Sequence, residues 1–327
     1  MTALPCCWKR FCSPLNRTRS LRLLFASLFA AVLGGCTSMN KLAVNKLGDA
    51  LASGGTAFSS DSDPELVRDA APFSLKLMES LLAENPRHAG LLYAAASGFT
   101  QYSYAFVQQD ADVTEANNVA AAASLRTRAR GLYLRGRDYG LRGLELAHPG
   151  LTADLRQNRP AALRGCGPDD VRLLYWTAVS WAAAIASAKD DPTLIADLPI
   201  AEALIDRALE LDEAFDHGAI HAFLITYEMS RAAGSGDPTA RARQHFERAL
   251  TLGHNAQAGP LVAFAEAVCI QQQDRPKFQA MLNQALAIDV NTRPEFRLLN
   301  LVMQRRARWL LGRIDELFLP VDSPASP

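Results

Sequence analysis

The sequence has no excess of positive charge, since 34 Lys and Arg residues balance 34 Asp and Glu residues over 327 positions. Proteins that bind nucleic acid concentrate Lys and Arg against its phosphates, so this balance argues against nucleic acid as a partner. The first apolar run is also short: it covers 11 residues, from Leu23 to Leu33. A helix that crosses a bilayer needs about 20 apolar residues, so this run is not predicted to span a membrane.

The first 35 positions contain no acidic residue, and their pattern indicates an export signal. Five basic residues precede the apolar run, and the small residues Gly34 and Gly35 follow it, as in a cleaved leader. The basic residues are Lys9, Arg10, Arg17, Arg19 and Arg22. Removal of this leader leaves 29 basic against 34 acidic residues, a formal charge of −5.

The tetrapeptide Leu33-Gly34-Gly35-Cys36 resembles the lipobox of bacterial lipoproteins. In that class, Cys36 becomes the first mature residue and carries lipid, palmitate included, on its thiol and amine. More than one acyl chain makes such an anchor stable. Thr37-Ser38 supplies no Asp at the second mature position, which by the same resemblance favours the outer membrane of a Gram-negative envelope, facing the periplasm. The alternative is an ordinary signal peptide that happens to end near a cysteine.

Cysteine is scarce in the expected mature chain. Of the six cysteines, Cys6, Cys7 and Cys12 leave with the leader and Cys36 is acylated, so Cys166 and Cys269 remain. Two cysteines cannot define a disulfide framework, although the periplasm would permit one bond. We expect two lone thiols, with Cys166 in a glycine-rich loop and Cys269 in an apolar helix.

These features divide the chain into four segments. We expect a leader at 1–35, a lipidated cysteine with a flexible polar tether at 36–62, a helical domain at 63–317 and a disordered tail at 318–327. The mature chain of about 290 residues is long enough for one large helical domain or two smaller ones.

The fold class is predicted to be all-α, because no convincing alternation of polar and apolar residues marks a strand after Asp63. Asp63-Pro64-Glu65 is a helix start, with a capping Asp followed by Pro at the first helical position. That helix is expected to break or kink near Pro72 and to end at Asn85-Pro86. Further helices are predicted at 88–109, 170–189, 199–211 and 218–231, and one more opens at Asp237-Pro238.

An internal repeat indicates the architecture. Arg207 to Asp212 reads RALELD, and it is echoed by RALTLG from Arg248 and by QALAID from Gln284. The alanines of successive copies are 41 and 36 residues apart, close to the tetratricopeptide period of about 34. The sequence therefore predicts an α-solenoid of tetratricopeptide-like helical hairpins, and a helical bundle without repeats is the alternative.

Several motifs in fixed order support a family resemblance. They are SDSDPELVRDA from Ser60, ESLLAENP from Glu79, ASGFTQYSYAFV from Ala96, LYWTAVSWAAAI from Leu174, GAIH from Gly218, QDR from Gln273 and RRA from Arg305. Together they resemble the TatT family, the lipoproteins with tetratricopeptide-like repeats that accompany tripartite ATP-independent periplasmic (TRAP) transporters. The resemblance covers about residues 36–317.

The resemblance implies a lipid-anchored periplasmic subunit, trimeric, that docks the soluble solute-binding subunit of a TRAP system. It also implies an apolar cavity or pore for a hydrophobic or organic-acid ligand, and neither a catalytic residue nor a cofactor. The expected function is non-enzymatic. A general cell-envelope tetratricopeptide scaffold for protein–protein interaction is the alternative.

Residues with catalytic or metal-binding chemistry do not converge in the sequence. His217 and His221 are four residues apart, but zinc needs three or four ligands, and no Glu forms an HExxH motif with them. His217 is also expected in the turn before its helix. We therefore expect no metal site, no cofactor and no enzyme activity.

Aromatic residues are the candidates for lining a ligand cavity. Phe99, Tyr102 and Phe106 follow helical spacing, whereas Tyr104 points to another side of the same helix. Tyr175 and Trp176 form a second group. Tyr and Trp combine a large apolar body with one polar tip, which suits cavities. Phe99, Tyr102, Tyr104, Tyr175 and Trp176 are the candidates, against core packing as the alternative for each.

An arginine-rich stretch offers a candidate surface for partner docking. It runs from Arg126 to Arg142 and contains only Asp138 for balance, with Glu145 following. Arg126, Arg130 and Arg137 are the candidates for docking an acidic partner surface, where charge would accelerate and orient encounter. A solvated helix face is the alternative.

Overall fold

The structure, a computed structural model, describes residues 45–52, 55–188, 190–231 and 236–320. The chain divides into two units, 1–46 and 47–327, and the fold given below is that of the second. The predicted leader, Cys36 and residues 321–327 of the predicted tail lie outside the described residues. Among the helices described, none has both the length and the apolarity to cross a membrane.

The described residues form helices and no strand, which confirms the all-α class. The α-helices of the first half are α2 (Gly55–Ser59), α3 (Pro64–Glu84), α4 (Ala89–Tyr102), α5 (Gln109–Glu115), α6 (Val119–Ala147), α7 (Leu151–Gln157), α8 (Arg159–Leu163) and α9 (Val171–Ala186). Those of the second half are α10 (Pro192–Ile195), α11 (Leu198–Leu211), α12 (Phe215–Glu228), α13 (Pro238–Leu252), α14 (Ala258–Phe264), α15 (Arg275–Ala287), α16 (Arg297–Gly312) and α17 (Ile314–Leu317).

Four shorter segments have tighter or wider helical turns. The segments η1 (Ser103–Gln108) and η3 (Ala265–Cys269) are π-helical, and η2 (Pro168–Asp170) and η4 (Pro294–Phe296) are 3-10 turns. η1 joins α4 to α5 without a break, so the helix predicted at 88–109 continues to Glu115.

The first long helix begins and ends where the sequence predicts. The Asp63 carboxylate accepts hydrogen bonds from the backbone N–H groups of Glu65 and Leu66, at 3.0 and 3.1 Å. Asn85 caps the other end of α3. The predicted break at Pro72 is wrong, because α3 continues through that residue, and a kink there stays a prediction. Pro72 removes one backbone hydrogen bond and crowds the carbonyl of the preceding turn, but it does not end the helix.

Helical or buried residues lie beyond both ends of the predicted helical domain. Within the segment predicted as a tether, residues 47–52 and α2 are helical. Phe318, the first residue of the predicted tail, is buried, and its ring lies 5.1 Å from that of Phe278.

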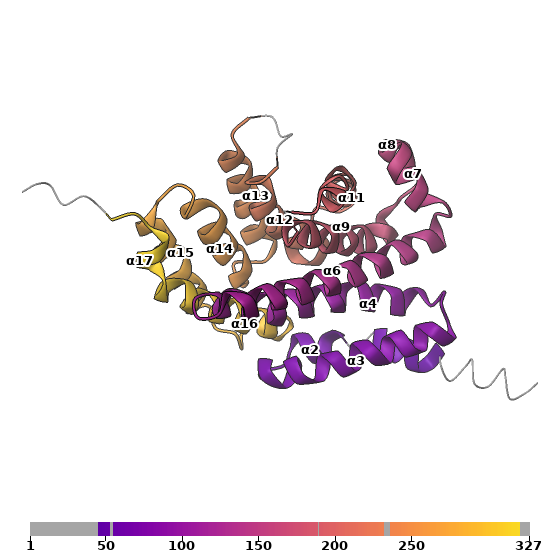
Figure 1. Cartoon of the computed structure of the whole chain (residues 1–327), viewed down its shortest axis with the longest axis horizontal. Helices are drawn as coiled ribbons and strands as arrows, with labels where there is room; N and C mark the ends of the chain where they lie inside the picture. Colours follow the sequence, from indigo (N-terminus) through magenta and orange to yellow (C-terminus); the bar gives the residue numbers. More distant parts are fainter. Residues whose placement is uncertain (1–44, 53–54, 189, 232–235, 321–327) are drawn as a thin grey trace, which may run out of the picture. The chain divides into compact units, whose positions relative to one another are not determined.

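Successive helices pack on one another in chain order. α3, α4, α6, α9 and α11 each contact the next, and Figure 1 shows α4, α6 and α9 side by side. α12 to α16 continue the series around a second apolar cluster. α16 then contacts α2 and α3 at the other end of the series. Because the last long helix returns to the first ones, this arrangement does not by itself establish the predicted tetratricopeptide-like solenoid.

The repeated alanines lie at equivalent places. Ala208, Ala249 and Ala285 stand near the ends of α11, α13 and α15, and all three are at most 1% exposed. A small residue there lets the neighbouring helix approach closely. The packing role that the repeat predicts for these residues is confirmed.

Candidate functional site

Two π-helical segments direct side chains to α16. π-Helical turns are uncommon in proteins as a whole, but many of those that occur lie at functional sites. From η1, the Tyr104 hydroxyl reaches the Met303 sulfur at 3.7 Å. From η3, Glu266 accepts hydrogen bonds from Arg306. The two widened turns thus bring residues about 160 positions apart to one helix.

A pocket of about 350 Å³ lies beside this meeting point. α5, α6 and α16 form its walls, and we call it the closure pocket because α16 here joins the early helices of the chain. Apolar and polar side chains share its lining. They are Gln109, Asp110, Val113, Thr114, Leu125, Arg305, Arg306 and Trp309.

Arg306 is the fixed cation of the closure pocket. Its side chain is 13% exposed, and its two terminal nitrogens each lie 2.7 Å from a carboxylate oxygen, one of Asp112 and one of Glu266. Its guanidinium also stacks over Trp309, 4.4 Å from the ring centre. Although burial acts to lower the pKa of this group, the two carboxylates raise it. Arg306 is therefore charged at every accessible pH and held on three sides.

Arg305 is held more weakly. Its Nη1 lies 2.8 Å from Glu65, whose side chain is 64% exposed. Its Nη2 donates to the backbone oxygen of Ala105 at 3.1 Å. Because an ion pair with an exposed partner contributes little, Arg305 can exchange Glu65 for another anion at small cost.

Further ion pairs surround the pocket. Arg68 binds Asp110 through two hydrogen bonds of 2.5 and 3.0 Å, and Arg126 binds Glu115 through two of 2.8 and 2.7 Å. The Arg126 hydrogen bond lowers the pKa of Glu115. Although Tyr104 is 37% exposed as a residue, loss of water around its hydroxyl, together with the charge of Glu266, raises its pKa to about 12, so this hydroxyl stays a neutral hydrogen-bond donor.

The five aromatic candidates do not meet in one place. Phe99 is buried and stacks on Tyr139 with ring centres 5.8 Å apart, and Tyr102 packs on Phe106 at 5.7 Å. Tyr175 and Trp176 contact each other at 4.9 Å in the cluster around α9. Of the five, Tyr104 interacts with Arg306 and Glu266, and Tyr102 with Arg68, all charged residues beside the closure pocket. The lining of that pocket comes from other residues, so the cavity role of the five stays a prediction.

The three arginine candidates for docking differ in their surroundings. Arg126 is paired with Glu115, and Asp112 lies 3.6 Å away. Arg137 pairs with Asp138 at 2.7 Å and lies over the Trp181 ring at 5.1 Å. Arg130 is half-buried, and no ion pair of it is recorded among the described residues. Their docking role is not tested by this geometry.

Histidines and cysteines lie partly as expected. His217 has a positive φ of 56° in the turn that starts α12, as expected, and His221 is buried. The Nδ1 atom of His221 lies 2.8 Å from Nδ1 of His245, a contact that the sequence did not indicate. Cys166 and Cys269 are both free and buried, as predicted.

The sequence reasoning missed the α16 residues of the pocket. Arg305 and Arg306 stood only as part of a family motif, and Trp309 was not considered. Their spacing gives one signal: Arg305 and Trp309 are four apart, so a cation and an aromatic ring share a helix face. The spacing does not indicate that α5, some 190 residues earlier in the chain, packs beside this face of α16.

Comparisons with known proteins add an independent observation. The sequence model of the family described as "TRAP transporter T-component" matches residues 60–318. A protein of Treponema pallidum (strain Nichols), described as uncharacterized, is 32% identical over 266 residues. That match spans 80% of this chain and 82% of the relative.

Proposed function

Because the chain belongs to the TRAP transporter T-component family, we propose that it is a non-enzymatic envelope subunit that docks a solute-binding subunit and shelters its ligand. The family is one of transporter components, and its name supports a place in the bacterial envelope. The closure pocket is the ligand site in this proposal. It is built from α16, the last long helix, and from α5 and α6, at least 150 residues earlier in the chain, and it carries paired but replaceable charge.

The lining of the closure pocket supports an organic acid with an apolar body as the ligand. Val113, Leu125 and the Trp309 ring provide apolar surface, and Arg305 provides the charge. A guanidinium binds a carboxylate through two parallel hydrogen bonds. Arg305 would turn from the exposed Glu65 to the ligand, while Arg306 stays on Asp112 and Glu266. This difference between the two arginines is the observation that carries the proposal.

Anchoring and assembly complete the proposal. Cys36 would hold the chain by lipid at the periplasmic face of the outer membrane, and three copies would associate. A lipid anchor raises the local concentration of the chain near membrane-bound partners. Mass spectrometry of the intact protein from its native host tests both points, since acylation at Cys36 and a threefold mass are expected. An unmodified Cys36 or a monomeric mass would contradict them.

The ligand class is tested by binding measurements with matched probes. Native mass spectrometry of the purified protein is expected to show a retained small acid. Calorimetry with a series of aliphatic carboxylates, against the amides of the same length, is expected to show binding of the acids only. Arg305→Gln should weaken that binding about tenfold or more, the loss of one charged hydrogen-bonding pair.

A matched control lies on the same helix. Arg308 is exposed one turn along α16 from Arg305 and does not line the closure pocket, so Arg308→Gln should bind as the parent does. Equal binding of acids and amides would overturn the ligand class. Equal loss in both variants would show a general charge effect and would remove the closure pocket from the proposal.

A further inference from the structure

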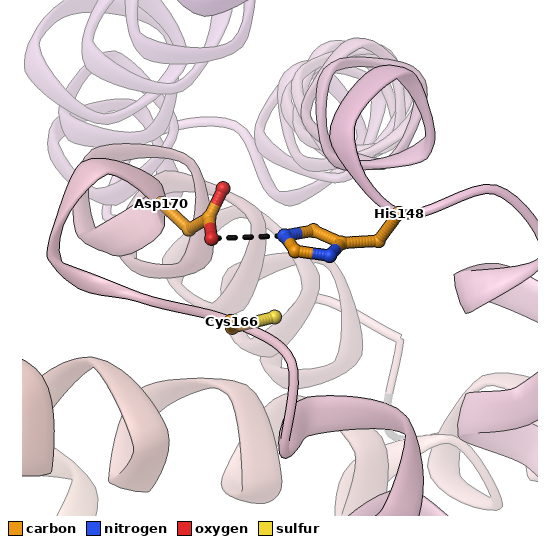
Figure 2. Close-up of side chains that lie close together, drawn as sticks. All are labelled: His148, Cys166 and Asp170. Carbon is orange, nitrogen blue, oxygen red and sulfur yellow. Dashed lines mark hydrogen bonds and ion pairs between the residues drawn. The ribbon is translucent and has the colours of Figure 1, made fainter.

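Three side chains with metal-binding chemistry meet away from the closure pocket. His148 follows the end of α6, Cys166 lies between α8 and η2, and Asp170 ends η2. One potential ligand atom from each lies within 4.8 Å of the other two. Figure 2 shows the imidazole, the thiol and the carboxylate turned toward a common space. Nε2 of His148 and Oδ2 of Asp170 are 2.9 Å apart.

We propose that His148, Cys166 and Asp170 bind a divalent cation of the zinc type. One nitrogen, one sulfur and one oxygen ligand form a set that suits Zn²⁺, and the hard ions Mg²⁺ and Ca²⁺ do not take thiolate. Zn²⁺ binds such atoms at about 2.0–2.3 Å. The three atoms lie within 4.8 Å of one another, about twice a zinc–ligand distance, so small side-chain rotations would bring them onto one cation.

The cluster has supporting contacts that position its members. The backbone N–H of Gly167 donates to Oδ2 of Asp170 at 2.9 Å, and Arg207 donates to the backbone oxygen of Cys166 at 2.8 Å. Contacts of this kind orient the ligands of metal sites and strengthen binding. They also hold the Gly165 to Pro168 loop, so that the thiol is presented to the other two residues.

One side of the cluster is open. Cys166 is 2% exposed, whereas the side chains of His148 and Asp170 are 22% and 15% exposed. The cation would enter from that side and keep water as its fourth ligand, as three-ligand zinc sites do. On binding, the S–H proton leaves to solvent and the sulfur lone pair forms the bond to the cation. One thiolate and one carboxylate then balance the double charge, and the imidazole binds as a neutral ligand.

The bare thiol is not prepared for catalysis. Burial, together with the charge of Asp170, raises the pKa of Cys166 to about 11, the opposite of an activated nucleophile. The site would instead tie the end of α6 to the start of α9 and so fix the α7–α8 segment between them. The site departs from the sequence-based expectation of no metal. It is independent of the proposed transport function.

The test uses Co²⁺ as a spectroscopic probe and Zn²⁺ as competitor on the full-length, metal-stripped chain. One equivalent of Co²⁺ should give a thiolate-to-cobalt charge-transfer band that Zn²⁺ removes. Cys166→Ser should abolish the band and weaken binding at least tenfold, and Asp170→Asn should weaken it while keeping the band. Cys269→Ser is the matched control, because Cys269 is equally buried but has no part in the cluster.

A second measurement separates binding from folding. Zn²⁺ should raise the melting temperature of the parent and of Cys269→Ser, and should leave that of His148→Gln unchanged, since a ligand stabilises only the state it binds. The partly exposed His148 is the variant of choice if Cys166→Ser fails to fold. Two outcomes would overturn the proposal. One is the absence of the charge-transfer band in the parent. The other is an unchanged band in Cys166→Ser, which would come from other cysteines, such as those near the N-terminus.

Discussion

The middle of the fold and the place where its ends meet are held together by different forces. In the glycine-packed centre, α6 lies against α4 and α9 through Gly136, Gly140 and Gly143. At the closure, α16 is joined to α5 and η3 through Arg306 and its carboxylate partners. The centre is close-packed and apolar apart from paired hydroxyls, such as Thr100 and Ser180 with oxygens 2.5 Å apart. The closure is ionic and borders a pocket.

This difference separates a scaffold from a site that can change. Close-packed helices tolerate little movement, because each added or lost atom alters many contacts. Ion pairs at the edge of a pocket can exchange one partner for another when an anion arrives. We therefore expect the centre to respond to changes of volume and the closure to respond to changes of charge.

The largest effect is expected from one added methyl group in the centre. A Cβ at position 140 would lie 2.2 Å from Oγ1 of Thr177 and 3.3 Å from its Cα. Because Oγ1 of the buried Thr177 donates to the backbone oxygen of Leu173 at 2.6 Å, either that hydrogen bond breaks or the helices separate. Gly140→Ala should therefore lower the free energy of unfolding by about 3 kcal/mol. Chemical denaturation measures this.

The same helix supplies the control. A Cβ at Gly131 would meet no atom within 4 Å, so Gly131→Ala should be stabilising by about 0.5–1 kcal/mol through helix propensity alone. If Gly140→Ala were as stable as Gly131→Ala, the centre would not be close-packed, and the contrast between the packed centre and the ionic closure would not hold.

The next largest effect is expected at the closure. Arg306→Met removes the charge but keeps an apolar chain on Trp309, and it leaves Asp112 and Glu266 without their main partner. The cost should be about 2 kcal/mol, less than for a fully buried pair because both carboxylates keep some access to water. High salt should reduce the difference between parent and variant. A salt-independent cost would mean that Arg306 acts by packing, like the centre.

The contact between two histidines is of a third kind, because its contribution to stability depends on pH. His221 and His245 join α12 to α13, and burial lowers the pKa of both. Arg231, Arg248, Glu213 and Glu228 also face the pair. The unfolded chain therefore takes up protons at a higher pH than the folded one. Stability from this pair is complete above the unfolded pKa of about 6.5 and is lost as pH falls toward the folded values.

Thermal melts at about pH 7.5 and 5.5 measure this effect. The melting temperature should fall on acidification, by less than Arg306→Met lowers it. His245→Gln should remove most of the pH dependence in this window. If the pH dependence of the melting temperature persists in His245→Gln, another titrating group causes it.

The sequence predicted local features well, but it predicted contacts between residues far apart in the chain poorly. Asp63 and Asn85 mark their helix ends through chemistry within a few residues, and the repeated alanines predicted buried positions because they follow one local pattern. The closure pocket depends on α5 and α16, which lie far apart in the chain, and His148, Cys166 and Asp170 come together through the α7–α8 segment. Pro72 does not end its helix, because the apolar face of the 21-residue α3 is buried on both sides of it and outweighs one lost hydrogen bond and a crowded turn.

The smallest expected effect concerns α6 itself, which passes from the closure to the centre. Arg126, near the closure, is neutralised by Glu115, and Arg137, near the centre, is neutralised by Asp138. Arg130 lies between them. If this face docks an acidic partner, Arg130→Gln should weaken association with a TRAP solute-binding protein a few-fold at low salt, and Arg126→Gln should weaken it less. Surface plasmon resonance at low and moderate salt measures both variants. Equal effects of the two, or binding that ignores salt, would show that partner docking does not use this face.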